Sequence, residues 1–499
     1  MRPINKHTRS GAMSYLNRKN GVIAVSALTL IAAAAAAPAY AADGDAVSDL
    51  DQRVRILERQ LEIQKEEADA KAKDAAIVTA DSKGFSIRSA DGEYSVELHG
   101  LVQGDARFYQ QGQNSSTTNQ FLLRRVEPTI SGNLTRFVGF TITPEFGNSS
   151  ATTPTNAVSG TTAGTPTVTA NLLDYYLDLR FDPAATLRIG RFKEPVGLEN
   201  LQATSAITFI ERGLAIDLQP NRDIGAQLQG RVLHNTLSYA VGVFNGAADG
   251  GDAPISNPDT HFDIAARIFA EPFKNAPGLF QGLGIGLSGT RGSAGNNLPI
   301  TTPASGSYYP SQIIASSSGS YVSTGQLKIF NYASGVTTAG LRTHFSPQAY
   351  WYYNRIGFLT EYVESTHSLS KGAVSDRLKN RAFQAQVSYL LTDDDASYTG
   401  VKPKHPFKLG RDGLGAFEVA ARYGSLNIDS KAFSEGFATA SKSVTKGARE
   451  YGVAFNWYLN NNAKLAINYE DSHFINAGAT PATDRPNERA LLLRAQINY

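Results

Sequence analysis

Cysteine is absent from all 499 residues, so the protein has no disulfide, no thiolate metal site and no lipid-attachment cysteine. Long apolar runs are scarce as well. Beyond residue 41 no segment reaches the about 18 consecutive apolar residues of a transmembrane helix. Neither an HExxH nor a G-x-S-x-G motif occurs, and the histidines are scattered. We therefore predict no enzyme, no cofactor and no metal site.

Residues 1–41 have the pattern of a secretory signal peptide. Five basic and no acidic residues precede an apolar run over 21–37. Small residues at Ala39 and Ala41 then predict cleavage after Ala41. An N-terminal membrane anchor is the alternative, but the run is short and ends at Pro38.

The positive net charge of the whole sequence, +2, comes from the basic residues of this predicted signal peptide. Without its five basic residues, 42 Lys and Arg face 45 Asp and Glu, a net charge of −3. We expect no nucleic acid among the partners.

Residues 46–74 predict a helix with one narrow apolar stripe. Apolar residues recur at spacings of three and four between charged ones: Val47, Leu50, Val54, Leu57, Leu61 and Ala68. This pattern is typical of a short coiled coil, and a narrow stripe buries little surface unless copies pair. A solvated single helix or a linker is the alternative. Residues 75–93 are expected to form a linker.

From residue 94 onward apolar residues recur at every second position. In the first such segment, 94–109, one face carries Tyr94, Val96, Leu98, Gly100, Val102, Gly104, Ala106 and Phe108. Polar residues occupy most of the other face. A soluble sandwich turns its apolar face inward, whereas a membrane barrel turns it outward to lipid. Alternation alone does not separate these two folds.

Three features favour the membrane barrel. The strands are about ten or more residues long, as bilayer crossing requires. Aromatic residues gather near strand ends, as at Trp351 and Trp457. The chain also ends in an aromatic, Tyr499. We therefore predict an all-β transmembrane antiparallel β-barrel over 94–499 in contact with outer-membrane lipid of a Gram-negative cell.

The alternation predicts about sixteen strands, near 94–109, 120–134, 136–147, 170–182, 185–193, 223–232, 236–245, 260–269, 282–291, 341–353, 355–366, 380–392, 414–428, 446–459, 463–473 and 489–499. An even number places both barrel termini, and hence the helix, on the periplasmic side. Such a barrel is roughly 30 Å across, too wide for side chains alone to fill.

The connections alternate between tight turns and long segments. Segments 148–169 and 292–340 are long and rich in small and polar residues, as expected for outer loops. For 292–322 a disordered linker is an equal alternative. Segment 194–222 is instead partly apolar, which predicts that it folds into the lumen and constricts it.

Five motifs together resemble the phosphate-selective porin O/P family. They are Arg191-Phe192-Lys193-Glu194-Pro195-Val196-Gly197-Leu198-Glu199, Ile207-Thr208-Phe209-Ile210-Glu211-Arg212, Gly242-Val243-Phe244-Asn245-Gly246, Arg124-Arg125 and Phe455-Asn456-Trp457-Tyr458-Leu459-Asn460. The resemblance covers about 94–499. It implies a sixteen-stranded homotrimer with an inward loop and basic residues along the solute path.

By this resemblance the candidate solute-binding residues are Arg124, Arg125, Arg191, Lys193 and Arg212, followed by Arg188 and Arg222. Guanidinium groups fit phosphate oxygens and stay charged at any working pH. The alternative is that some of them only pin the loop by pairing with Glu194, Glu199, Glu211 or Asp223.

The resulting hypothesis is a porin for passive diffusion of small solutes, mainly anions such as phosphate or polyphosphate. Acidic and basic residues balance on the polar strand faces, so any anion preference must arise at the constriction. A barrel-anchored adhesin or envelope tether acting through the coiled coil is the alternative function.

Overall fold

The computed structural model describes residues 44–81, 84–110, 119–147, 171–253, 257, 259–295, 320–410, 413–477 and 485–499. The predicted signal peptide and the loop 148–169 lie outside these residues. No helix within the described part is long and apolar enough to cross a membrane. The chain divides into two units, Met1–Lys73 and Asp74–Tyr499.

The first unit contains helix α1, Gly44–Asp74, which covers the segment predicted as helical. Its apolar stripe is solvent-exposed, with Leu50 at 64%, Leu57 at 63% and Leu61 at 68% exposure. Arg53 and Arg55 each pair with an aspartate one turn earlier, Asp49 and Asp51. These ion pairs support the helix.

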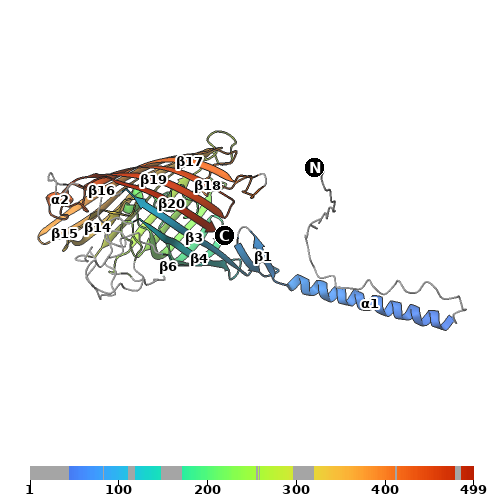
Figure 1. Ribbon diagram of the computed structural model, residues 1–499. Helices are drawn as coiled ribbons and strands as arrows, with labels where there is room; N and C mark the ends of the chain where they lie inside the picture. Colours follow the sequence, from blue (N-terminus) through green and yellow to red (C-terminus); the bar gives the residue numbers. More distant parts are fainter. Residues whose placement is uncertain are drawn as a thin grey trace, which may run out of the picture. The chain divides into compact units, whose positions relative to one another are not determined.

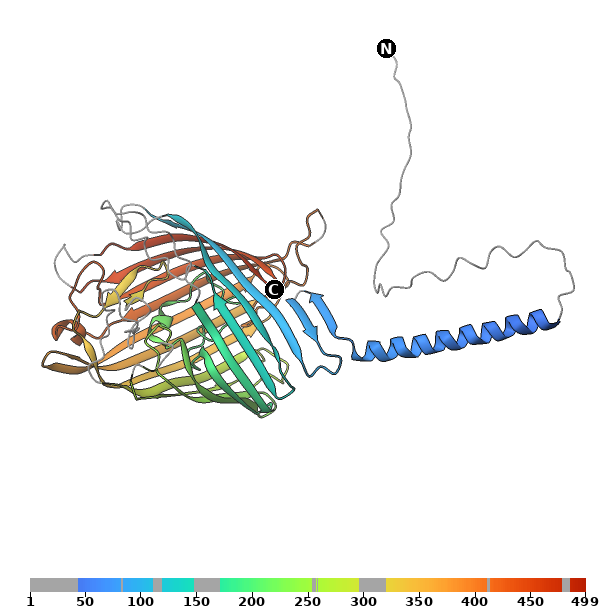
Figure 2. The ribbon, with the colours of Figure 1, turned by 90° about the horizontal axis from the view of Figure 1, so that it is seen from below.

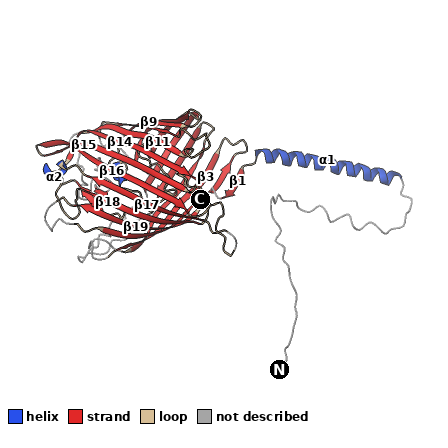
Figure 3. Cartoon of the chain, turned by 90° about the horizontal axis from the view of Figure 1, so that it is seen from above, coloured by secondary structure: helices blue, strands red, loops and turns tan. Residues whose placement is uncertain are grey.

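The second unit is a closed antiparallel barrel of sixteen strands (Figures 1 and 3). They are β3 Ser95–Tyr109, β4 Gln120–Asn133, β5 Val138–Glu145, β6 Asn171–Asp182, β7 Ala185–Lys193, β8 Arg222–Val232, β9 Leu237–Phe244, β10 Asp263–Ala270, β11 Leu283–Ala294, β14 Thr337–Tyr353, β15 Ile356–Lys371, β16 Val374–Leu390, β17 Ala416–Asn427, β18 Gly447–Tyr458, β19 Ala463–Ile475 and β20 Glu488–Asn498. Each predicted strand corresponds to one of these.

The barrel closes between its first and last strands. β20 pairs with β3 from Ala490 opposite Tyr109 to Asn498 opposite Leu101. The predicted linker 75–93 is not wholly a linker, since it contains a hairpin of β1, Ile77–Asp81, and β2, Gly84–Arg88. β2 pairs with β3 just beyond the point where β20 ends. The hairpin therefore extends the barrel wall beside β3. Its two strands have only five residues each, too few for an apolar–polar alternation to predict them from the sequence.

Apolar side chains point outward and polar ones inward. On β18 and β19, Val453 is 55% and Phe455 40% exposed, whereas Asn468 is 0% and Glu470 1% exposed. A soluble barrel would show the opposite arrangement. The predicted direction of the two-residue repeat is thus confirmed, and the outer surface suits hydrocarbon.

The two ends of the barrel differ. The turn end carries tight connections, such as 183–184 and 459–462, together with β1, β2 and the C-terminus. The loop end carries the longer segments, and a four-residue helix, α2 (Lys431–Ser434), lies in one of them. Figure 2 shows the tilted strands between these ends. Two connections depart from this pattern: the turn end also holds the 25-residue connection 391–415, and only residues 372–373 join β15 to β16 at the loop end.

Part of the lumen is filled by an apolar cluster at the loop end. Segment 320–336 contains β12, Ser320–Val322, and β13, Lys328–Asn331. Its aromatic residues Tyr321, Phe330 and Tyr332 are at most 2% exposed and pack with Leu214 and Leu218 of a short 3-10 helix, η1 (Leu214–Leu218), and with inward residues of the wall. This part of the predicted outer loop 292–340 therefore lies within the barrel.

Candidate functional site

The segment between β7 and β8, residues 194–221, crosses the barrel. Its two ends join neighbouring strands, yet its middle contacts the opposite wall. The Leu198 amide donates to Glu361 of β15 over 2.7 Å, and the Ile210 amide donates to Asn468 of β19 over 2.5 Å. Lys464 of β19 donates to the Ile207 carbonyl over 2.9 Å. We call this segment the crossing loop.

One carboxylate of the crossing loop, that of Glu211, lies inside a ring of arginines. Glu211 lies 2.5 Å from Arg107, 2.7 Å from Arg124 and 3.4 Å from Arg494. Burial raises the pKa of the Glu211 carboxyl, but Arg124, Arg107 and their neighbours lower it further, so the pKa lies well below its usual range. The carboxylate stays charged and fastens the loop to β3, β4 and β20.

Two of the predicted basic residues also belong to this ring or its edge. Arg124 donates two hydrogen bonds to the Glu211 carboxylate, from Nε over 2.7 Å and from Nη2 over 3.1 Å. Arg125 donates to Gln103 over 2.8 Å and lies 4.0 Å from Glu211. Both residues therefore lie against the carboxylate that fixes the loop. This agrees with the alternative interpretation, in which some of the basic residues hold the loop in place and do not bind solute.

The remaining predicted residues lie around the base of the crossing loop. Arg188 binds Asp178 with two hydrogen bonds of 2.8 and 2.9 Å, and its guanidinium lies 3.8 Å from the centre of the Tyr176 ring. Arg222 binds Asp174 in the same two-pronged way, at 3.0 and 3.1 Å.

Three more predicted residues donate to backbone carbonyls of nearby loops. Arg191 Nη1 donates to Ala253 over 2.8 Å, and Lys193 Nζ donates to Asn200 over 2.5 Å. Arg212 donates to the carbonyls of residues 199 and 202 at 2.9 and 2.8 Å. Arg212 therefore stabilises the curve of the crossing loop itself.

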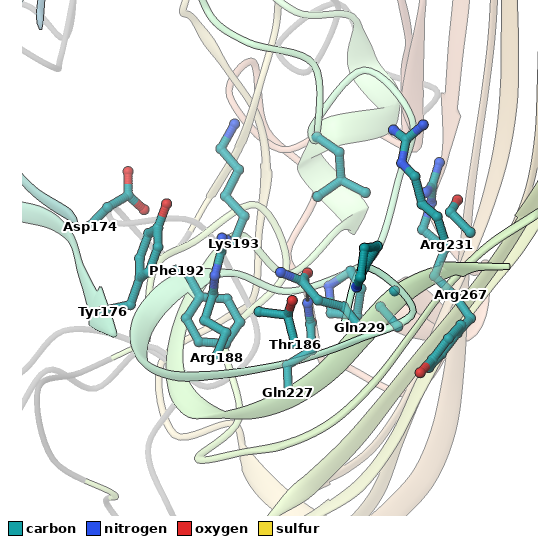
Figure 4. A pocket seen from close by; sticks show the side chains of 17 residues that line it. Asp174, Tyr176, Thr186, Arg188, Phe192, Lys193, Gln227, Gln229, Arg231 and Arg267 are labelled. Carbon is teal, nitrogen blue, oxygen red and sulfur yellow. Dashed lines mark hydrogen bonds between the residues drawn. The ribbon is translucent and has the colours of Figure 1, made fainter. Parts of the chain in front are cut away.

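Two cavities lie between the crossing loop and the wall. One, of about 590 Å³, is lined by β6 to β10 and contains Arg188, Lys193, Arg231, Arg267 and Asp174 (Figure 4). The other, of about 360 Å³, borders β3 to β6 and reaches Asn498 and Tyr499 at the turn end. Asp174, Lys193 and Leu201 line both cavities. The cavities thus meet beneath the loop.

The charge of the larger cavity is strongly one-sided. Among its described lining residues, four cationic side chains face one acidic side chain, Asp174. The prediction missed Arg231 and Arg267, because it counted them only as part of a balanced wall. Their position next to Gln227 and Gln229 on one inward patch depends on strand register, which the sequence pattern did not supply.

The crossing loop also meets a segment from the turn end. Tyr398, in connection 391–415, donates to the Leu198 carbonyl over 2.6 Å, and its ring stacks on Tyr350 with centroids 5.0 Å apart. Gln202 donates back to the Tyr398 carbonyl over 2.7 Å. No sequence signal beyond the unusual length of this connection pointed to that contact.

A family model described as phosphate-selective porin O and P matches residues 96–499, starting one residue into β3. The chain belongs to this porin family. The predicted resemblance is therefore confirmed, and the porin is an outer-membrane channel and not an enzyme.

Two solved structures are similar to this porin at low identity. The outer membrane channel DcaP of Acinetobacter baumannii matches with a TM-score of 0.49 and 10% identity, over 83% of this porin and 99% of that chain. An anion-selective porin from Comamonas acidovorans matches with a TM-score of 0.47 and 12% identity, over 82% and 100%. Comparison with curated protein sequences gave no match.

Proposed function

We propose that this porin is a passive diffusion pore for small anions and that the crossing loop forms its constriction. The observation that carries the proposal is the cationic lining of the larger cavity, in which Arg188, Lys193, Arg231 and Arg267 face Asp174. A surplus of fixed positive charge in a narrow, water-filled passage raises the local concentration of anions.

The pairing of the arginines argues for broad anion passage. Arg188 and Arg222 already direct two donors each at Asp178 and Asp174. Several guanidinium donors are therefore already used by these carboxylates. We expect a passing phosphate to be attracted by the positive charge of the cavity and not to be held by a specific set of hydrogen bonds. Phosphate and polyphosphate belong to the anions that we expect to pass.

Ion selectivity in planar lipid bilayers tests the proposal. With different salt concentrations on the two sides of the bilayer, the reversal potential of the unmodified porin should show that anions permeate more readily than cations. The triple variant Arg188→Gln, Lys193→Gln and Arg267→Gln should move it toward zero without closing the channel. Arg136→Gln removes an exposed charge from the turn between β4 and β5 and serves as control. Cation preference of the unmodified porin would contradict the proposal.

We further propose that helix α1 forms a parallel coiled coil in the periplasm and supports a homotrimer. The exposed stripe of Leu50, Val54, Leu57 and Leu61 supports this, since burying a leucine contributes about 1.5–3 kcal/mol. Leu57→Asp should reduce the trimer fraction in cross-linking experiments, whereas Gln52→Asp, outside the stripe, should not. Unchanged trimers in Leu57→Asp would refute this role.

The same stripe also suits a tether that binds another envelope component. Deletion of residues 44–74 separates the two functions. A pore keeps its single-channel conductance after the deletion, whereas a protein whose barrel is only an anchor shows no ion conductance in either form.

A further inference from the structure

Three metal-ligand side chains from distant parts of the chain meet inside the loop end of the barrel. Asp249 follows β9, His344 lies on β14 and His367 lies on β15. Asp249 Oδ1 is 2.7 Å from His344 Nε2 and 3.0 Å from His367 Nε2. All ligand atoms of this group lie within 4.8 Å of one another, and all three residues are at most 3% exposed.

The spacing of these atoms fits a small cation after a slight expansion. Zn²⁺ binds imidazole nitrogen and carboxylate oxygen at about 2.0–2.2 Å, which places neighbouring ligands of a tetrahedral site about 3.3 Å apart. The observed separations of 2.7 and 3.0 Å need an increase of only a few tenths of an ångström.

Surrounding groups hold these ligands in place. His344 Nδ1 lies 2.6 Å from Thr290 Oγ1, a contact that fixes the ring and leaves Nε2 available as a ligand when Nδ1 carries the proton. Ser365 Oγ lies 2.7 Å from His367 Nε2 and 2.8 Å from Asp249 Oδ2. Its hydroxyl, or a water in its place, suits the fourth position.

The charge of the site favours a cation. The nearest arginine along β14, Arg342, is neutralised by Asp263, whose oxygen lies 2.7 Å from Arg342 Nη2. The positive charge next to Asp249 is therefore compensated and does not oppose a bound cation.

We propose that Asp249, His344 and His367 bind a divalent transition-metal ion, with Zn²⁺ as the best fit. Tyr321 of β12 donates to Asp249 over 2.9 Å. A bound ion would therefore fasten both the segment after β9 and the inner strand β12 to the barrel wall. The sequence contains no recognisable metal motif here because Asp249 is 95 residues from His344 and 118 from His367.

Metal titration of the detergent-extracted full chain tests this assignment. After removal of bound metal with a chelator, calorimetry with Zn²⁺ should give one tight site per chain. Co²⁺ in its place should give the visible absorption of a tetrahedral site. Both signals should be lost in His344→Gln/His367→Gln, and added Zn²⁺ should raise the melting temperature of the unmodified chain only.

Matched controls separate this site from surface histidines. His99→Gln/His473→Gln removes two partly exposed histidines that also lie beside carboxylates, at 3.2 and 3.3 Å, and should keep the tight site. Asp249→Asn preserves the shape of the cluster but removes the anionic ligand, so zinc affinity should fall at least tenfold. Unchanged zinc binding in Asp249→Asn or in the double histidine variant overturns the proposal, as does the absence of a tight site.

Discussion

Arg124 and Glu211 are 87 residues apart in the chain, yet Arg124 Nε donates to Glu211 Oε1 over 2.7 Å inside the barrel. This contact joins the second barrel strand to the middle of a loop that starts at the end of β7, three strands further along the wall. Arg107 and Arg494 share the same carboxylate, so Glu211 ties the crossing loop to three neighbouring strands of the wall at once.

Glu211→Gln should loosen the crossing loop and destabilise the barrel. The substitution leaves several buried guanidinium groups without their shared anion, a change that costs about 3–5 kcal/mol when a buried ion pair loses one partner. We expect a lower melting temperature in detergent and a larger, noisier single-channel conductance. Glu93→Gln, which breaks an exposed pair with Arg136, is the control and should change neither.

Asp174→Asn should strengthen anion preference. Asp174 is the acidic side chain that lines both cavities, and it holds Arg222 at 3.0 Å. Neutralising it frees part of the Arg222 charge and should raise the anion-to-cation permeability ratio on the order of twofold. Asp182→Asn, at the β6–β7 turn, is the matched substitution outside the cavities. A shift toward cations would show that these cavities are not the ion path.

Tyr398→Ala should widen the passage below the crossing loop. Its ring stacks on Tyr350, and its hydroxyl donates to the Leu198 carbonyl over 2.6 Å. Loss of both contacts should raise the conductance. Tyr398→Phe keeps the ring and loses only one hydrogen bond, worth about 1 kcal/mol, so its conductance should stay near that of the unmodified porin. Equal conductance in all three proteins would place the connection 391–415 outside the path.

Glu194→Gln should stabilise the barrel, and more so at alkaline pH. Burial, with help from Asp223 and Asp263, raises the pKa of the Glu194 carboxyl well above its usual range. A raised folded-state pKa means that folding favours the protonated acid. Stability is therefore lost as pH rises above the unfolded value of about 4.3. The gain in melting temperature from Glu194→Gln should be larger at pH 8 than at pH 4; the reverse order would contradict it.

The strands could be predicted because each must present apolar residues to lipid at every second position. That signal is weaker where strands extend past the hydrocarbon. β15 runs to Lys371 and β16 starts at Val374, five and six residues beyond their predicted limits of 366 and 380. Serine, lysine, aspartate and arginine are common in these extensions, whereas Leu369 and Leu378 are buried in the apolar cluster inside the barrel, so the usual alternation of apolar residues toward lipid is lost.

The basic residues of the site could be named from sequence, but their partners could not. Arg188 and Asp178 face each other because of strand register, and Glu211 meets Arg494 across 283 residues through a loop that folds inward. Neither pair of residues can be recognised from the spacing of apolar and polar residues along the sequence. For the same reason, the inward position of segment 320–336 and of Tyr398 was missed.

The barrel can close only when β20 is present to pair with β3. Asp105 and Arg494 join across this pair of strands at 2.7 Å, although 389 residues separate them. The sheet therefore has two unprotected edges until the last residues have been translated and exported. Hairpin β1–β2 covers β3 only at residues 95–98 and leaves 101–109 free to receive the C-terminal strand. A chain truncated before β20 would keep both edges exposed and be prone to aggregation.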